Sequence, residues 1–333
     1  MKKVFIFFIN VILIISSFML TSCVGNVILI YTAAEDERNA YIQAELEKKF
    51  PNTPIVLQSM GSGNLVSKLQ AEDKMTDCDI FYDLEVTNAE IVLNANPNLF
   101  YDLSEYDFTI YEDDYLDYTV THKKYAINGK VNAGILINRD LFSSKGIAIP
   151  KTYNDLLKPE YKNLISMPNP KSSGTGYCFY NGIVSSLGEE DGLEYFQKLN
   201  DNVKEFTSSG SAPVKSVQRG DVAIGVGLLW QCVNYANTND NLEVLILENK
   251  LPYNLFTMGI INTHQDKPMV KEIFDYLYNE LNINQVSLYN PDILYVNQDS
   301  PKIQNYPTSY KDIKMSGVFD YNYKQNLLDK WKW

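Results

Sequence analysis

The chain has 333 residues, of which 29 are Lys or Arg and 41 are Asp or Glu, so its formal net charge is −12. A chain this acidic lacks the basic face that binds a phosphate backbone, which excludes a nucleic-acid partner. Hydrophobic residues make up 45% of the sequence, enough for a packed core, and the length favours two domains over one.

The N-terminus has the pattern of an export signal. Lys2-Lys3 precedes an uncharged, mostly apolar run over residues 4–20, as in a cleaved signal peptide. The end Leu20-Thr21-Ser22-Cys23 resembles the bacterial lipobox, which implies that residues 1–22 are removed and that Cys23 is lipidated. We therefore expect an exported protein, anchored by its lipid to the bacterial cell membrane and facing periplasm or cell exterior. An uncleaved N-terminal anchor is the alternative.

The segments after the signal predict the start of an open parallel sheet. Apolar runs predict strands over 26–31, 54–58 and 78–84, and helical spacing predicts helices over 35–50 and 65–73. This β-α-β-α-β order is typical of an α/β fold. Residues 97–130 are acidic and rich in tyrosine, and we expect an excursion with short helices over one lobe.

A second α/β series follows in the later part of the chain. Strands are predicted over 164–167, 203–206, 222–227 and 242–247, with helices over 177–187, 190–199, 212–218 and 229–235. Two further strands, near 133–138 and 256–261, are candidates for crossings between two lobes. A short helix is expected over 153–157, an amphipathic helix over 267–281 and a last helix near 326–331.

Cysteine and histidine are too scarce to indicate a metal or redox centre. The exported part would retain Cys78, Cys178 and Cys232, which allow at most one disulfide and are at least as well explained as buried thiols. The two histidines, His122 and His264, lie in no catalytic motif, which argues against a secreted hydrolase.

Three loops share one design that suits an anion. Gly61-Ser62-Gly63, Ser172-Ser173-Gly174-Thr175 and Ser208-Ser209-Gly210-Ser211 each follow a predicted strand and precede a predicted helix. Glycine lets a ligand approach the backbone, hydroxyls donate hydrogen bonds, and the first N–H groups of a helix attract negative charge. Plain helix capping explains any one such loop, but three across both series favour an anion site at the carboxyl ends of the strands.

These motifs resemble those of a known family. The run Val27-Ile28-Leu29-Ile30-Tyr31-Thr32-Ala33, the loops above and Val217-Gln218-Arg219-Gly220-Asp221-Val222-Ala223-Ile224-Gly225 are similar to bacterial extracellular solute-binding proteins of ABC transporters. Within the type 2 periplasmic binding proteins, the likeness is to the ferric-iron, 2-aminoethylphosphonate and thiamine branch. It implies an α/β fold of two lobes, each a mixed sheet flanked by helices, joined by two crossing strands. Lobe 1 would comprise residues 26–130 and 256–333, and lobe 2 residues 131–255.

The resemblance also implies a function. The protein would be a monomeric binding protein and not an enzyme, with no cofactor, and would deliver a small-molecule solute to an ABC permease after hinge closure. The favoured ligand is an anionic or zwitterionic organophosphonate or phosphate ester, and ferric iron and thiamine derivatives are alternatives. Iron-binding members carry adjacent tyrosines after the strand 222–227, where this sequence has Leu228-Leu229, which argues against iron.

The expected ligand-binding residues come from both lobes. Hydroxyl and N–H donors for an anionic group are expected at Ser172, Ser173, Gly174, Thr175, Ser209 and Ser211, and at Tyr31, Thr32, Ser62 and Gly63. Asp83 would hold a cationic group or cap a helix. Trp230 would stack on the ligand or pack in the core, and Tyr235 lies near it in the sequence.

A surface lipoprotein that binds other proteins through residues 100–125 is a further alternative. This alternative predicts an exposed apolar patch over that stretch.

Overall fold

The computed structural model describes residues 27–112, 123–289, 291–292, 294–299 and 302–333. The export signal with Cys23, and His122 in the acidic stretch, lie outside the described residues. Within the described chain, no helix is both long enough and apolar enough to cross a membrane.

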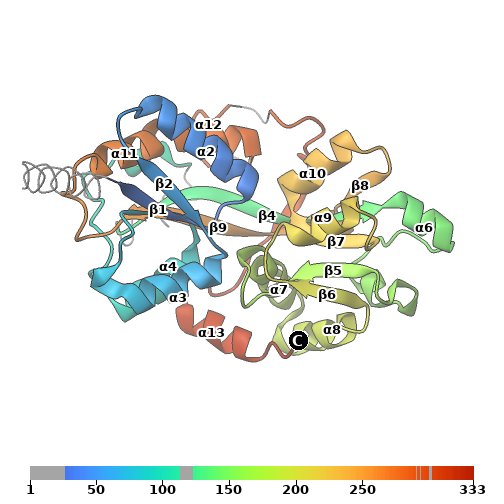
Figure 1. The fold of residues 1–333 in the computed structure, drawn as a ribbon. Helices are drawn as coiled ribbons and strands as arrows, with labels where there is room; N and C mark the ends of the chain where they lie inside the picture. Colours follow the sequence, from blue (N-terminus) through green and yellow to red (C-terminus); the bar gives the residue numbers. More distant parts are fainter. Residues whose placement is uncertain (1–26, 113–122, 290, 293, 300–301) are drawn as a thin grey trace, which may run out of the picture.

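One mixed sheet extends through the molecule (Figure 1), with strand order β2-β1-β3-β9-β4-β7-β5-β6, β8 beside β4 and β10 beside β9. Its strands are β1 (Ile28–Thr32), β2 (Ile55–Ser59), β3 (Ile80–Glu85), β4 (Ala126–Asn138), β5 (Ile165–Pro168), β6 (Val203–Thr207), β7 (Ile224–Leu228), β8 (Leu242–Leu245), β9 (Lys250–Ile260) and β10 (Lys311–Ile313).

The two longest strands, β4 and β9, join the lobes. β4 pairs with β9 over residues 126–132 and with β7 over residues 133–137, both antiparallel. On its other edge β9 pairs with β3, which leads through parallel pairs to β1 and β2. β7 leads through parallel pairs to β5 and β6. The predicted two-lobed α/β fold with two crossing strands is confirmed.

Helices cover both faces of this sheet (Figure 1). They are α2 (Asp36–Lys49), α3 (Ser62–Glu72), α4 (Val86–Ala95), α6 (Arg139–Lys145), α7 (Gly174–Leu187), α8 (Glu189–Leu199), α9 (Ala212–Gln218), α10 (Leu229–Thr238), α11 (Val270–Tyr276), α12 (Asn282–Tyr289) and α13 (Tyr321–Asp329). A π-helical turn, Leu277–Leu281, connects α11 to α12, and short 3-10 turns include Asp73–Met75, Phe108–Ile110, Asn154–Leu157, Pro159–Tyr161 and Leu247–Asn249.

Helix α4 is the clearest element that the sequence patterns missed. It follows β3 with no intervening loop, and all residues of β3 are buried. No glycine or proline separates β3 from α4, and the N-cap residue Glu85 makes no side-chain cap hydrogen bond, so the boundary at Val86 gives no signal in the sequence. The missed helix turns the chain back toward α3, which it packs against.

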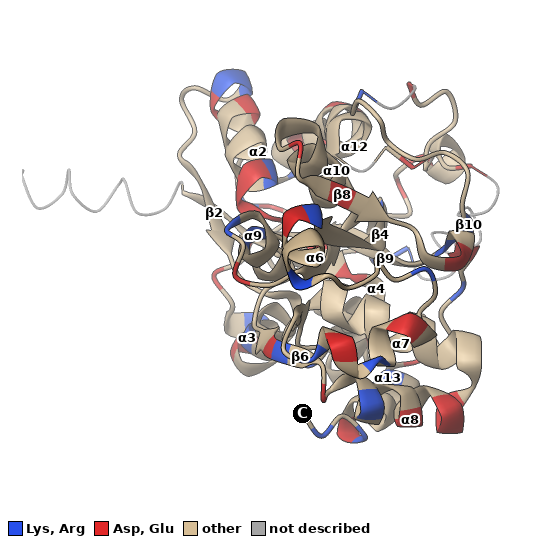
Figure 2. Ribbon diagram, turned by 90° about the vertical axis from the view of Figure 1, so that its right-hand side faces the viewer, with Lys and Arg blue, Asp and Glu red and all other residues tan. Residues whose placement is uncertain are grey.

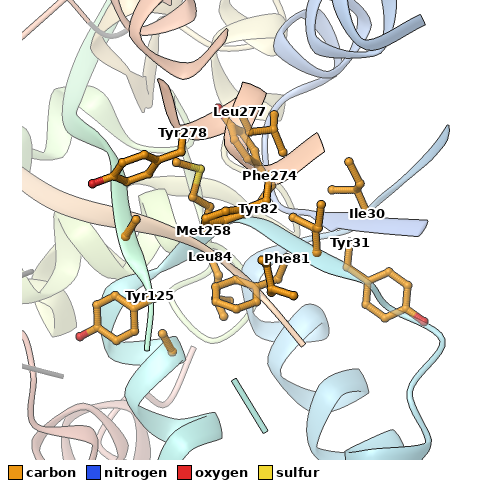
Figure 3. Close-up of a cluster of buried hydrophobic side chains, with 14 of the residues drawn as sticks. Ile30, Tyr31, Phe81, Tyr82, Leu84, Tyr125, Met258, Phe274, Leu277 and Tyr278 are labelled. Carbon is orange, nitrogen blue, oxygen red and sulfur yellow. The ribbon is translucent and has the colours of Figure 1, made fainter. Parts of the chain in front are cut away.

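Two hydrophobic cores lie on either side of the crossing strands. The first, drawn in part in Figure 3, gathers side chains of β1, β3, α2, α3 and α11, with Phe81, Tyr82 and Phe274 at its centre. The second gathers side chains of β5, α7, α8 and the C-terminal segment.

The C-terminal residues pack differently from the predicted division into lobes. Residues 256–333 were expected in lobe 1, yet Ile313, Met315, Leu327 and Trp331 belong to the second core. The reason is an aromatic cluster on the second lobe: the Trp331 ring lies edge-on to Tyr180, with 5.0 Å between centroids, and also contacts Phe196 and Phe206.

The described part of the tyrosine-rich stretch is packed. Phe100, Phe108, Tyr111 and Tyr125 are buried in the first core. The large exposed hydrophobic residues of the described chain are Val56, Met75, Leu187 and Val296, none of them between residues 100 and 112. The predicted excursion ends earlier than expected, because β4 begins at Ala126.

The cysteines Cys78, Cys178 and Cys232 are free and buried. Cys178 belongs to the second core and Cys232 to a separate small cluster, so these two thiols do not pair. Burial raises the pKa of all three thiols.

Candidate functional site

A cavity of about 170 Å³ lies between the lobes, where strands of both lobes end. Its lining brings together the loops that the sequence analysis singled out. The lining residues are Ala33, Ala34, Glu35, Asp36, Ser59, Met60, Gly61, Ser62, Ser172, Ser173, Gly174, Thr175, Ser208, Ser209, Gly210, Ser211 and Phe256.

The second lobe contributes the start of α7 to this cavity. Ser173 is the N-cap of α7 because its hydroxyl oxygen accepts a hydrogen bond from the N–H of Gly176, at 3.3 Å. The N–H groups of Gly174 and Thr175 belong to the first turn, where a helix offers no carbonyl partner. This helix end therefore presents N–H donors and a partial positive charge to the cavity.

The first lobe contributes the start of α3 opposite. Ser62 is buried, and its hydroxyl oxygen accepts a hydrogen bond from Asn88 Nδ2 at 2.9 Å. Gly61 lies so close to the other lobe that a Cβ on it would stand 2.8 Å from the carbonyl oxygen of Ser172. Only glycine allows the two loops to meet in this arrangement.

The third loop closes the second-lobe side. A Cβ on Gly210 would stand 2.3 Å from Thr175 Oγ1, so this glycine lets the loop 208–211 pack directly on the start of α7. Ser209 is exposed and Ser211 half-buried. The hydroxyl-bearing residues of loop 172–175 and of loop 208–211 therefore line the same cavity.

An acidic side faces the hydroxyl-rich loops. Glu35 lines the cavity with a side chain that is 14% exposed, and its carboxylate accepts a hydrogen bond from Arg38 Nη1 at 3.2 Å. Burial raises the pKa of Glu35 to about 7, against the opposing effect of Arg38. Arg38 is fully buried and makes two hydrogen bonds with Asp83, of 3.0 and 2.8 Å.

Polar contacts also connect the lobes beside the cavity. Lys215 Nζ of α9 lies 3.8 Å from the carboxylate of Asp36 in α2. Gln231 Nε2 of α10 donates to Glu37 at 3.4 Å. The structure thus shows the start of α2 in the first lobe in contact with α9 and α10 of the second.

Several predicted ligand-binding residues line the cavity, and others do not. Ser62, Ser172, Ser173, Gly174, Thr175, Ser209 and Ser211 line it. Tyr31 points instead toward α3, where its hydroxyl donates to Glu72 at 3.1 Å (its buried position is drawn in Figure 3). The Thr32 hydroxyl bonds with Asn39 and accepts from the N–H of Ala34, so it shapes the loop after β1. Gly63 borders a neighbouring pocket.

The remaining predicted residues, Asp83, Trp230 and Tyr235, have other positions. Asp83 neither caps a helix nor lines the cavity, because its carboxylate pairs with Arg38. Trp230 is 3% exposed and packs edge-on against Tyr289, which matches the core-packing alternative. Tyr235 is half-buried against the small cluster of Cys232, outside the lining.

The acidic side of the cavity is what the sequence analysis missed. Glu35 and Asp36 follow β1 at its carboxyl end, the place where ligand groups are expected, but they resembled an ordinary acidic first turn of a helix. Nothing in the sequence showed that the Arg38 side chain would be buried and would pair with the carboxylate of Asp83.

The charge and metal-ligand pattern bears on the kind of ligand. In the ribbon of Figure 2, positions of Asp and Glu and positions of Lys and Arg are both spread over the helices of the face shown. The lining residues, all within the described chain, include no Lys or Arg. Among the residues that the structure describes, no three His, Cys, Asp or Glu side chains converge as a metal site.

Comparison with known proteins gives the family. The family model for bacterial extracellular solute-binding proteins matches residues 95–281. The chain therefore belongs to the bacterial extracellular solute-binding protein family. An uncharacterized protein of Haemophilus influenzae is 23% identical over 293 residues, which cover 81% of this chain and 80% of the relative.

Solved structures share the fold at low sequence identity. The periplasmic binding protein P5PA is 20% identical with a TM-score of 0.78, over 92% of this chain and 98% of its own. The periplasmic binding protein AfuA from Actinobacillus pleuropneumoniae, solved with fructose-6-phosphate, is 19% identical with a TM-score of 0.78, over 91% and 97%. A periplasmic thiamin binding protein is 11% identical with a TM-score of 0.76, over 92% and 95%.

Proposed function

We propose that this protein is the lipid-anchored solute-binding component of an ABC importer, and that it captures a small organophosphonate or phosphate ester between its lobes. Cys23 would carry the lipid, and a membrane permease would receive the solute. The protein would act as a monomer and would bind its ligand without a covalent step. Hinge closure about β4 and β9 would enclose the ligand.

The observation that carries this proposal is the convergence of three hydroxyl-rich and glycine-rich loops on one cavity. The starts of α3 and α7 face it from opposite lobes. Hydroxyls and free N–H groups bind phosphate or phosphonate oxygens without a basic side chain, because each contributes a short, directed hydrogen bond. The bound anion would thus stabilise the contact between lobes.

The cavity also argues for a short ligand. Its volume of about 170 Å³ is below the roughly 300–1,000 Å³ of pockets for drug-sized molecules. Glu35 and Asp36 on the facing side suit a cationic group, in the role that the sequence analysis gave to Asp83. We therefore favour a zwitterion whose anionic group meets the loops and whose ammonium group meets Glu35.

The proposal is tested by thermal unfolding of the full-length protein in detergent micelles with candidate ligands. The panel contains 2-aminoethylphosphonate and other phosphonates, phosphate esters, thiamine forms, polyamines and ferric salts. A ligand at about 100 times its Kd adds roughly 2.7 kcal/mol to the free energy of unfolding, and the midpoint rises accordingly. We expect this rise with a phosphonate or a phosphate ester.

Variants locate the bound anion. Ser173→Ala combined with Thr175→Ala should abolish the rise, whereas Ser144→Ala on α6, outside the cavity lining, should preserve it. A rise with ferric salts alone would replace the proposed ligand with iron, and a rise with thiamine forms alone would replace it with thiamine. No rise with any compound would contradict the transport function and favour a lipoprotein that binds other proteins.

A further inference from the structure

Lys324 of α13 lies buried between the lobes, behind the cavity that we assign to the ligand. The residue is 4% exposed, its ammonium group contacts the carboxylate of Glu85, and it donates to Asn88 Oδ1 at 2.6 Å. Its Nζ lies 4.2 Å from the centroid of the Tyr177 ring. Burial lowers the pKa of Lys324, and the Glu85 carboxylate offsets part of that effect.

The groups around Lys324 belong to different lobes. Glu85 ends β3 and Asn88 lies in the first turn of α4, both in the first lobe. Tyr177 lies in the first turn of α7 in the second lobe. The backbone of α13 is also fixed to the second lobe, since the Tyr180 hydroxyl donates to the Leu327 carbonyl at 3.1 Å.

The segment before α13 has the same double attachment. Thr87 Oγ1 of the first lobe donates to the carbonyl of Val318 at 2.7 Å. Asn181 Nδ2 of the second lobe donates to the carbonyl of Ser316 at 2.9 Å. The C-terminal segment therefore forms a connection between the lobes that is separate from the crossing strands β4 and β9.

A short hydrogen-bonded path leads from Lys324 to the ligand cavity. Asn88 accepts from Lys324 through Oδ1 and donates through Nδ2 to Ser62 Oγ at 2.9 Å. The backbone N–H of Glu85 also donates to Ser62 Oγ, at 3.4 Å. Because these donors occupy the lone pairs of the hydroxyl oxygen, the Ser62 hydroxyl is left to donate its own hydrogen, and Ser62 lines the cavity.

We propose that Lys324 is a positioning residue that ties the C-terminal helix of the second lobe to the ligand-binding loop of the first and sets Ser62 as a hydrogen-bond donor toward the cavity. Lys324 acts through Asn88 and Glu85 and does not touch the ligand. The contacts that make this connection join only residues of this chain, so the proposal holds or fails independently of the ligand that we propose.

Hydrogen–deuterium exchange of the full-length protein in detergent micelles, without added ligand, tests this role. Lys324→Met should raise exchange at least tenfold in peptides that contain residues 61–65 and 174–178, in both lobes. Lys324→Arg should restore slow exchange, because a guanidinium group keeps the charge and the donors. Lys330→Met is the matched control, since Lys330 is the C-cap residue of the same helix but pairs with Glu189 of the second lobe, at 2.6 Å.

A second variant keeps the test decisive if Lys324→Met does not fold. Glu85→Gln with Lys324→Met removes both charges and leaves no unpaired carboxylate, and this double variant should show the same faster exchange at both loops. Unchanged exchange at residues 61–65 in a folded variant would overturn the proposal. Faster exchange confined to α13 would overturn it as well, because Lys324 would then serve only its own helix.

Discussion

Glu35 lies just after the first strand of lobe 1, and its carboxylate lies between the cavity and the buried guanidinium group of Arg38. The Asp83 carboxylate makes the closer pair with Arg38, at 2.8 Å compared with 3.2 Å for Glu35. Arg38 therefore compensates the negative charge of Asp83 more fully than that of Glu35. A partly compensated acid such as Glu35 is suited to a cationic ligand group, which would supply the missing charge.

The raised pKa of Glu35 makes a prediction about stability and pH. Between its ordinary value near 4.5 and its folded value of about 7, the folded chain holds a proton that the unfolded chain has released. This group therefore lowers the free energy of unfolding as pH rises through that range, by up to about 3 kcal/mol. In urea unfolding at pH 5 and pH 8, Glu35→Gln should gain stability relative to the wild type at the higher pH.

The same comparison has a clear contrary outcome. If the difference in stability between Glu35→Gln and the wild type is the same at pH 5 and pH 8, Glu35 does not change its proton affinity on folding. Burial at the cavity would then leave the pKa of Glu35 unchanged.

At the scale of elements, the start of α7 combines a capping role with the ligand-binding role that we propose for it. The Ser173 hydroxyl oxygen accepts from Gly176 N–H, which leaves the N–H groups of the first turn directed at the cavity. The corresponding serine of α9, Ser211, makes no side-chain cap hydrogen bond. Ser173 and Ser211 stand in similar loop motifs, but only the side chain of Ser173 caps a helix.

This difference can be measured without a ligand. Ser173→Ala should lower the free energy of unfolding by about 1 kcal/mol, because it removes an N-cap, whereas Ser211→Ala should change it by less than about half of that. Urea unfolding monitored by circular dichroism gives both values. A loss of less than about half a kcal/mol for Ser173→Ala would show that the cap on α7 contributes little stability.

For the whole molecule, the contact between lobes depends on backbone approach at Gly61. This residue has φ −61° and ψ 146°, angles that any amino acid adopts, so alanine brings no backbone strain. The added Cβ would instead stand 2.8 Å from the carbonyl oxygen of Ser172 in the other lobe. The substitution therefore acts on the closed arrangement and on little else.

Gly61→Ala should weaken ligand affinity on the order of tenfold or more, which corresponds to about 1.4 kcal/mol, while the ligand-free unfolding midpoint changes little. Isothermal titration with the compound found in the thermal screen gives the affinity. If that affinity matched the wild type, the lobes would not need to approach this closely to hold the ligand.

How much of this was predictable differs between the fold and the site. The strands near 28–32 and 203–207 and the helices 189–199 and 212–218 followed from local periodicity, since burying one face of an element needs only neighbouring residues. The hydroxyl-rich loops stood out because the carboxyl ends of strands meet at one edge of a sheet. Helix α4 and the packing of the C-terminal segment depend on distant partners and gave no such signal.

Apolar spacing and Gly-Ser clusters are local properties of the chain, so the two α/β series and the three loops could be predicted from them, and the resemblance to solute-binding proteins implied the two lobes. Which charged groups face the cavity depends instead on contacts between distant segments. Arg38, in an ordinary acidic helix start, pairs with Asp83 from another strand and leaves Glu35 at the cavity. Lys324, far along the chain, reaches Glu85. The pairing of buried charges depends on their distance in space and on desolvation, and neither can be read from the order of residues in the chain.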